Sequence, residues 1–147
     1  MDETVRKAIT LAVKKEPFAQ ALKMKLVELE DGYSVVEMVY DPDKMDNIYR
    51  RSHGGAIYAL TDEAFETAGQ TDGTVAVALN VNITYVASPR QGVLLNAEAR
   101  RVSQTKKTAV YEVKVTDQDQ NLIATSQALA YRTGKPIPFL EAESVRR

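Results

Sequence analysis

Residues 47–64 read NIYRRSHGGAIYALTDEA, a polar loop that runs through two glycines into the start of an apolar helix. Apolar side chains recur at helical spacing through residues 56–69. They are Ile57, Leu60, Ala64 and Ala68, with Tyr58 and Phe65 widening their face. A helix with so broad an apolar surface is expected to be buried by structure that wraps around it. This segment therefore predicts one central helix.

Outside this segment the sequence alternates with the period of a β-strand. Residues 25–41 predict a strand, a turn at Asp31-Gly32 and a second strand, or one long strand bent at the glycine. Their short turns make the following strands an antiparallel meander, predicted at residues 75–85, 94–102, 108–116 and 122–132. We expect an α+β fold, in which an antiparallel curved sheet wraps around one long helix.

The two ends complete the expected single domain of residues 1–147. Residues 1–22 are predicted to form an extra N-terminal helical segment, which Pro17 interrupts because proline lacks the N–H that a helix interior needs. Residues 41–52 are expected to form a polar loop, and residues 134–147 a C-terminal tail. A chain of 147 residues can bury a core without disulfides or a structural metal.

The composition excludes several classes of site. The chain has 19 Lys and Arg against 20 Asp and Glu, so it lacks the basic footprint of a nucleic-acid-binding protein. It has no cysteine, which excludes disulfides, cysteine nucleophiles and thiolate metal sites. Its one histidine, His53, cannot build a metal site that needs several imidazoles. We therefore expect no metal and no cofactor.

No segment reads as a targeting or membrane-spanning sequence. The first residues, MDETVRK, open with acids and precede no long apolar run, unlike a secretory signal. No window approaches the roughly 18 consecutive apolar residues that a transmembrane helix needs. The sequence predicts a cytoplasmic protein that binds neither membrane nor nucleic acid.

The glycine pair at the start of the predicted helix favours carbonyl chemistry. Gly54 and Gly55 allow a ligand to approach the backbone closely, because neither carries a Cβ. The N–H groups in the first turn of a helix have no intrahelical partner, and the helix dipole adds positive potential there. A carbonyl placed against them would be polarised as in an oxyanion hole.

Three acids follow on the same helix. Asp62 lies seven residues after Gly55, two helical turns along the same face, where a carboxylate is costly unless it is paired or functional. Glu66 lies one turn further on the face of Asp62, whereas Glu63 is rotated by about 100°. Spacing alone leaves open which acid is functional, because acids on helices are most often simply solvated.

The remaining polar residues of the segment are ambiguous by themselves. His53 more commonly orders a helix entry through a backbone hydrogen bond than transfers a proton. Asn47 is either a loop cap or an amide that holds a water or a carbonyl. The basic pairs Arg50-Arg51 and Lys106-Lys107 could meet phosphates, although such pairs are usually solvated charge.

The segment as a whole resembles the PaaI-type acyl-CoA thioesterases of the phenylacetate pathway, which have the hotdog fold. Their pattern is an Asn, then His-Gly-Gly six residues on, then a helix with Leu-x-Asp and a small residue two later. Here these are Asn47, His53-Gly54-Gly55, and Leu60, Asp62 and Ala64, without a gap. The run NVNITY at residues 80–85, followed by Ser88-Pro89, is similar to the central strand and turn of the family, and the resemblance spans residues 25–132.

The resemblance implies a role for each matching residue. Asp62 would act as nucleophile or general base, the N–H of Gly54 would polarise the thioester carbonyl, and Gly55 would adjoin the substrate. His53 would orient the carbonyl or the loop, and Asn47 would position the water or the thioester. Acyl-CoA would be the substrate, and its phosphates have basic candidates in Arg50, Arg51, Arg90, Lys106 and Lys107. The family also implies a homodimer, commonly a dimer of dimers, with Asp62 and Asn47 of one site on different chains.

One position departs from the family pattern, and two other functions remain open. Some relatives carry a Ser or Thr hydroxyl where this chain has Ala78, so a partner for the attacking water is missing there. A non-catalytic binder of acyl-CoA or aromatic ligands could use the same fold, since fold does not fix function. A hotdog enoyl-CoA hydratase or dehydratase would instead use His53 with an acid for proton transfer.

Overall fold

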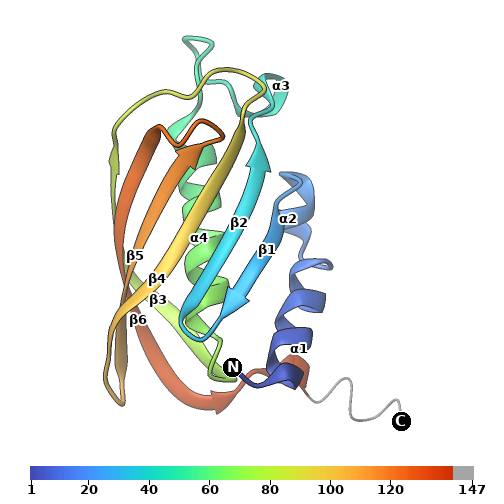
Figure 1. Ribbon diagram of the computed structural model, residues 1–147, viewed down its shortest axis with the longest axis vertical. Helices are drawn as coiled ribbons and strands as arrows, with labels where there is room; N and C mark the ends of the chain where they lie inside the picture. The colour runs from blue at the N-terminus through green and yellow to red at the C-terminus, as the bar shows by residue number, and fades with distance from the viewer. Residues whose placement is uncertain (141–147) are drawn as a thin grey trace.

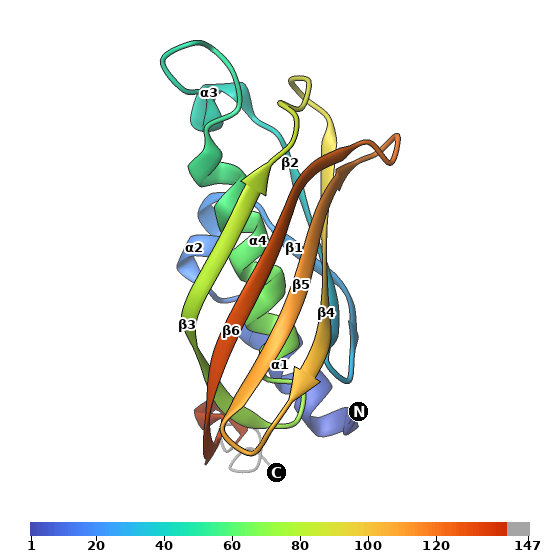
Figure 2. The ribbon, with the colours of Figure 1, turned by 90° about the vertical axis from the view of Figure 1, so that its left-hand side faces the viewer.

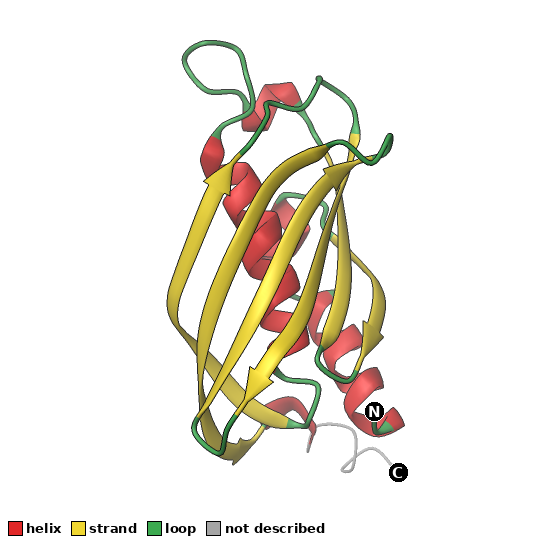
Figure 3. Ribbon diagram, turned by 60° about the vertical axis from the view of Figure 1, so that its left-hand side comes forward, coloured by secondary structure: helices red, strands yellow, loops and turns green. Residues whose placement is uncertain are grey.

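The computed structural model describes residues 1–140 as a curved antiparallel sheet closed around one long helix (Figure 1). The helix α4 spans Gly54–Gly69 and lies in the concave face of the sheet, as predicted. Ten of its 16 residues are buried. This is the α+β hotdog arrangement, and Figure 3 shows the strands passing obliquely around the helix.

The sheet has six strands in the order β1-β2-β4-β5-β6-β3, and every neighbouring pair is antiparallel. Their bounds are β1 Lys25–Glu30, β2 Tyr33–Val39, β3 Thr74–Tyr85, β4 Leu94–Gln104, β5 Thr108–Asp117 and β6 Leu122–Pro136. The hairpin β1–β2 turns at Gly32, whose φ of +65° is easily adopted by glycine. The first of the two alternatives for residues 25–41, strand, turn and strand, is therefore the one observed.

The predicted meander is right for β4, β5 and β6 and wrong for β3. β3 pairs with β6 instead of its chain neighbour β4, because the connection of residues 86–93 carries the chain across the end of the sheet. β3 consequently forms an edge of the sheet, as Figure 2 shows. Twelve residues of backbone run along that edge without a neighbouring strand within the described chain.

The core lies between α4 and the concave face of the sheet. Phe65 of α4 meets Tyr111 of β5 edge to face, with ring centroids 5.4 Å apart. Small side chains on the strands, such as Ala97 and Ala99 of β4, are fully buried and let the helix approach closely. The packing of α4 against β2, β4 and β5 sets the position of the helix relative to the sheet.

The N-terminal helices cover the side of α4 next to β1. α1 spans Glu3–Val13, capped by Asp2, whose carboxylate accepts from the N–H groups of Thr4 and Val5 at 2.8 and 3.1 Å. α2 spans Pro17–Ala21 and begins at the proline, which is favoured at the first position of a helix. No helix among residues 1–140 is long and apolar enough to cross a membrane.

Two boundaries differ from the sequence predictions. The loop predicted for residues 41–52 contains a short helix, α3 at Pro42–Met45, because Asp41 caps it and proline begins it. The tail predicted to start at residue 134 is packed structure as far as residue 140. β6 continues to Pro136, Ile137 is fully buried, and the 3₁₀ helix Pro138–Leu140 lies against α1. Residues 141–147 of the predicted tail lie outside the described residues.

Candidate active site

The start of α4 is built by His53 and Gly55. His53 is the N-cap residue, and its Nδ1 accepts a hydrogen bond of 2.8 Å from the N–H of Gly55. A Cβ on Gly55 would lie 2.9 Å from that nitrogen, so glycine is what allows the ring to fold over the helix end. This cap explains why the helix begins at Gly54, two residues earlier than apolar spacing indicated.

Gly54 is held from the other side by β3. Its carbonyl oxygen accepts a hydrogen bond of 3.1 Å from the hydroxyl of Tyr85, and an added Cβ would lie 3.1 Å from the tyrosine ring. The N–H of Gly54 donates to no protein acceptor within residues 1–140. It is therefore a fixed donor at the positive end of the helix, available to a ligand.

Asn47 closes the loop that leads to the helix. Its side-chain Oδ1 accepts from the N–H groups of Tyr49 and Arg51 at 2.8 and 3.2 Å, and its own N–H donates to the Arg51 carbonyl at 2.7 Å. In this conformation the amide oxygen of Asn47 is occupied as a loop cap. The amide NH₂ has no hydrogen bond to another described residue, which leaves a donor for an incoming group.

Asp62 opens onto a pocket of about 250 Å³ between α4 and the strands β3 and β6. Its carboxylate is half-buried and has no hydrogen bond or ion pair with any of residues 1–140. Burial raises the pKa of this carboxyl above its ordinary value, because the charged form loses solvation. The pocket walls are mainly apolar or small: Phe65, Gly69, Ala76, Val77, Ala78 and Ala130.

The other two acids of α4 have different surroundings. Glu66 lines the same pocket as Asp62, as their spacing predicted. Glu63 instead faces the N-terminal segment, where it is 3% exposed and close to Glu16. Burial, then repulsion from Glu16, raises the pKa of Glu63 to about 8, and burial with repulsion from Glu16 and Asp62 raises that of Glu66 to about 7.

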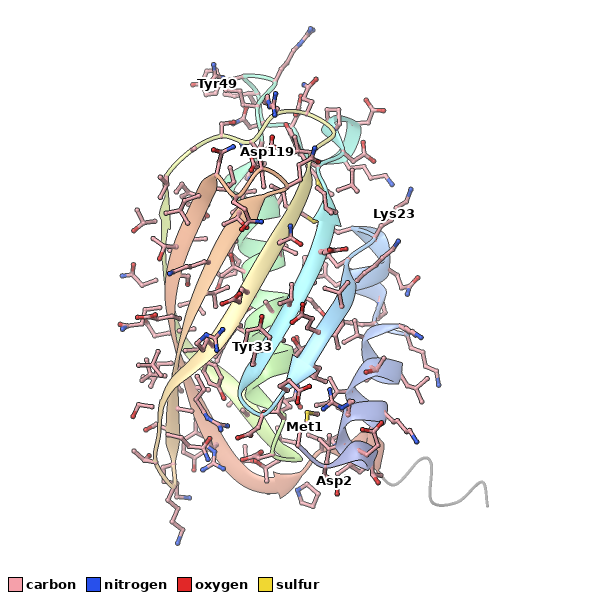
Figure 4. All side chains as sticks on the ribbon, in the orientation of Figure 1. Met1, Asp2, Lys23, Tyr33, Tyr49 and Asp119 are labelled. Carbon is pink, nitrogen blue, oxygen red and sulfur yellow. The ribbon has the colours of Figure 1, made fainter. Side chains whose placement is uncertain are left out.

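The predicted phosphate contacts fall at two ends of the molecule. Arg50 and Arg51 are exposed on the loop before α4, and Arg90 lies in the β3–β4 connection, paired with Asp119 at 3.0 Å. Figure 4 shows Tyr49 and Asp119 at this one end, opposite Met1 and Asp2. Lys106 and Lys107 follow β4, whose 11 residues span about 35 Å. A single protomer therefore cannot present both sets to one CoA.

Ala78 lines the pocket beside Asp62, so the position aligned with the family hydroxyl does adjoin the candidate carboxylate. Two residues that the sequence left unassigned also belong to this region. Tyr85 anchors Gly54, and Glu16 meets Glu63 and Glu66. The tyrosine had a signal, since it ends the predicted strand, but the contact of Glu16 with α4 is purely tertiary.

Comparison with known proteins identifies the class of this fold and site. Residues 51–124 match the family model described as the thioesterase superfamily. The acyl-coenzyme A thioesterase PaaI of Escherichia coli K12 is 31% identical over 119 residues, which cover 81% of this chain and 84% of that protein. The chain belongs to the thioesterase superfamily.

Solved structures narrow the assignment within that superfamily. The structure of E. coli PaaI superposes with a TM-score of 0.86 at 28% identity, covering 91% of this chain and 96% of that one. A Streptococcus mutans UA159 protein solved with acetyl-CoA bound is 31% identical, with a TM-score of 0.73 and coverage of 78% and 91%. The chain is a PaaI-type hotdog thioesterase, which confirms the resemblance read from the sequence.

Proposed function

We propose that the protein hydrolyses acyl-CoA thioesters to a free acid and CoA, with Asp62 as the nucleophile or general base. The observation that carries this proposal is the Asp62 carboxylate, which faces an apolar pocket without a partner among residues 1–140. A structural acid in such a place would be expected to be paired. The names of the relatives, a thioesterase and a protein with acetyl-CoA bound, support the substrate class.

The reaction balances with Asp62 and water alone. As general base, Asp62 takes a proton from water while the hydroxyl forms the new C–O bond to the thioester carbon. The C–S bond then breaks, and the CoA thiolate leaves with the proton that Asp62 held. As nucleophile, Asp62 would attack the thioester carbon, the C–S bond would break, and the CoA thiolate would leave a mixed anhydride. Water would then hydrolyse the anhydride to the free acid and the Asp62 carboxylate, and its remaining proton would go to the thiolate. In both routes the N–H of Gly54 stabilises the developing oxyanion.

The spacing of these two groups supports a site shared between two protomers. Gly54 and Asp62 are eight residues apart on one straight helix, a rise of about 12 Å. A carbonyl that accepts a hydrogen bond of roughly 3 Å while it is attacked from roughly 3 Å cannot bridge that separation. We infer that Asp62 of one chain faces Gly54 and Asn47 of a second copy.

The free edge of β3 is the surface through which we expect the two copies to pair. The strand is long and carries exposed apolar side chains, including Val77 and Leu79, and long unpaired edges of this kind pair with another chain. Val77 also lines the Asp62 pocket, so a partner on this edge would sit beside the carboxylate. The homodimer is the unit that the site needs, and pairing of two such dimers into a tetramer stays a family-based expectation.

His53 and Asn47 support the site in different ways. His53 holds the helix start in place through Gly55, which makes it a positioning residue for the Gly54 N–H. Asn47 shapes the loop through its oxygen and offers its amide donor to the thioester or the attacking water. Of the basic candidates, Arg50, Arg51 and Arg90 lie at the same end of the molecule as Gly54, which favours them as the partners of CoA phosphates. Lys106 and Lys107 could contribute only from another protomer.

The experiment is hydrolysis of a panel of aromatic, short-chain and long-chain acyl-CoAs, followed by detection of the released thiol. We expect turnover by the native protein and a loss of about 10²–10⁴-fold in Asp62→Asn, the range typical of a missing general base. Glu66→Gln changes the other acid of the same pocket and should lose far less activity. This comparison shows which of the two acids is catalytic. Glu112→Gln, an exposed acid on β5, is the matched control.

Three results would contradict the proposal. Full hydrolysis by Asp62→Asn would remove the assigned mechanism. Tight binding of acyl-CoA with no thiol release at any pH would make the protein a non-catalytic binder. Addition of water to an enoyl-CoA without thioester cleavage would make it a hydratase.

The shared site has its own test on the edge strand. Leu79→Lys places a charge on the β3 edge, and Val102→Lys places one on the interior strand β4; the native side chains are 57% and 56% exposed. Sedimentation velocity should show Leu79→Lys dissociating, with thiol release lowered at least about tenfold, while Val102→Lys stays paired and active. A fully active Leu79→Lys monomer would show that one chain suffices.

A further inference from the structure

Three glutamates from two segments of the chain meet where α4 faces the N-terminal segment, and one of them, Glu66, also borders the Asp62 pocket. Glu16 lies between α1 and α2, and Glu63 and Glu66 lie one turn apart on α4. One carboxylate oxygen from each lies within 4.8 Å of one from each of the others. Folding therefore brings Glu16 to two acids that are 47 and 50 positions away in the chain.

The described residues offer this cluster no cationic partner. Glu63 is 97% buried, and its Oε1 has no hydrogen-bond partner. None of the ion pairs within residues 1–140 includes any of the three glutamates. A buried carboxylate is retained in a fold when a cation, a metal or a proton offsets its charge. The lack of a hydrogen-bond partner for the buried Glu63 Oε1 is a second observation, independent of the short distances between the three carboxylates.

The arrangement of oxygens selects a type of cation. A set made only of carboxylates suits hard cations, not the softer metals that prefer nitrogen and sulfur. Ca²⁺ binds oxygen at 2.3–2.6 Å, so ligands on its opposite sides are separated by about 4.6–5.2 Å. Oxygens that lie within 4.8 Å of one another can all reach one such ion. Three carboxylates favour Ca²⁺, because Mg²⁺ usually takes only one or two carboxylates and keeps several waters.

We propose that Glu16, Glu63 and Glu66 form a binding site for a divalent cation of the Ca²⁺ class. The shortage of histidine and cysteine excludes nitrogen and sulfur sites but does not bear on a site built from oxygen. A neighbouring cavity of about 360 Å³ is lined by Glu16, Glu66, Thr67 and Gln70 and has room for waters that complete six to eight ligands. Binding would tie the N-terminal segment to α4.

Lys15 provides the competing explanation, because its side chain lines the same cavity. Its ammonium lies beyond 4.0 Å from all three carboxylates, since it makes no ion pair with them. Replacing it separates the two explanations. If the cluster is a cation site, Lys15→Met binds the added cation at least as tightly as the native protein does.

Isothermal titration of chelator-treated native protein with CaCl₂ tests the site directly. We expect one ion per chain, weaker binding of MgCl₂, and a melting temperature raised by roughly 5–10 °C at about 100 times Kd. Loss of a group that merely supports a metal ligand costs roughly 10–100-fold in affinity, so losing a ligand in Glu63→Gln should cost at least about tenfold. Glu112→Gln, exposed on β5, should bind as the native protein does.

Glu16→Gln keeps the test decisive if the buried substitution disturbs folding, because Glu16 lies outside the helices at a partly exposed position. It should lose affinity to a similar degree while its circular dichroism and cooperative melting are retained. The absence of saturable Ca²⁺ or Mg²⁺ binding, or equal binding by Glu16→Gln and Glu63→Gln, would overturn the proposal and leave a cluster that only takes up protons. Neither readout uses thioester hydrolysis, so the site is judged independently of the proposed enzymatic function.

Discussion

The hydroxyl of Tyr85 donates a hydrogen bond of 3.1 Å to the carbonyl oxygen of Gly54, which ties the end of the edge strand to the first residue of the central helix. The residue that carries the candidate oxyanion donor is therefore held both by its own helix and by β3. The position of the donor therefore depends on β3 through Tyr85. The same strand is the edge through which we expect two copies to pair.

The first prediction concerns this contact. Tyr85→Phe should keep the ring against Gly54 and lose only the hydrogen bond, a change of about 0.5–1.5 kcal/mol. If that energy positions the donor, kcat for acyl-CoA hydrolysis falls about 2- to 10-fold with little change in KM. Tyr49→Phe, at the exposed tip of the loop before α4, is the matched control and should leave kcat unchanged. Equal rates for both variants would show that the contact does not position the donor.

The second prediction separates the capping role of His53 from any chemical role. His53→Ala removes the acceptor of the Gly55 N–H and should cost about 0.5–2 kcal/mol of stability, as the loss of other N-caps does. Asparagine is among the best capping residues, so His53→Asn should restore the melting temperature. Since we propose that His53 only positions the Gly54 N–H, we expect His53→Asn to restore most of the turnover as well. Recovery of stability without recovery of kcat would instead assign chemistry to the imidazole.

The third prediction is the pH dependence of hydrolysis. Asp62 must be ionised to act as base or nucleophile, and burial raises the pKa of its carboxyl. The rate constant kcat/KM should therefore rise with pH and level off, with a midpoint above the value of about 3.9 for an unperturbed aspartate. A pH–rate series on a single acyl-CoA measures it. A midpoint below 3.9 would mean that another group controls the acid limb.

The fourth prediction is the pH dependence of stability in the presence of a chelator. The pKa of Glu63 rises from 4.5 to about 8 on folding, so its protonated form favours the folded state. This contribution is complete below pH 4.5 and is lost as the pH rises toward 8. The groups that face it are Glu16, Glu66 and Asp62, with Lys15 in the adjoining cavity.

Thermal melts between pH 5 and pH 9 measure this loss. The native protein should melt at progressively lower temperature, whereas Glu63→Gln should show a flatter profile and a higher melting temperature at pH 9. Each tenfold change in proton affinity on folding changes the free energy of unfolding by about 1.4 kcal/mol. For a domain of this size, that shifts the melting temperature by roughly 3–6 °C. Glu112→Gln should keep the native slope. A native slope in Glu63→Gln would place the titrating group elsewhere.

Local signals in the sequence predicted most of the fold. The broad apolar face of residues 56–69 marks a buried helix, and the alternation of β4, β5 and β6 marks consecutive strands. The pairing of β3 with β6 could not be predicted in this way, because strand order depends on contacts between distant segments. Ile137 was missed for a similar reason: its burial comes from tertiary packing after the strand pattern has ended.

The candidate site likewise has a part that local spacing predicts and a part that depends on tertiary packing. The spacing of Gly54, Asp62 and Glu66 on one helix gives their relative positions directly, and the structure places Asp62 and Glu66 in one pocket. Two neighbouring residues, Asp62 and Glu63, have opposite surroundings, which only the packing of the N-terminal segment determines. Glu16 carried no signal at all, since an acid before a proline is ordinary at a helix start.

The edge of β3, unpaired within the described chain, affects how a newly synthesised chain reaches its native state. In the proposed homodimer, a protomer that has not yet paired exposes a strand edge with apolar side chains, to which another extended segment can add. On this proposal assembly competes with aggregation, and we expect pairing to be part of reaching the native state. Variants that weaken the edge should accumulate in the insoluble fraction, so their catalytic rates have meaning only when normalised to soluble, correctly assembled protein.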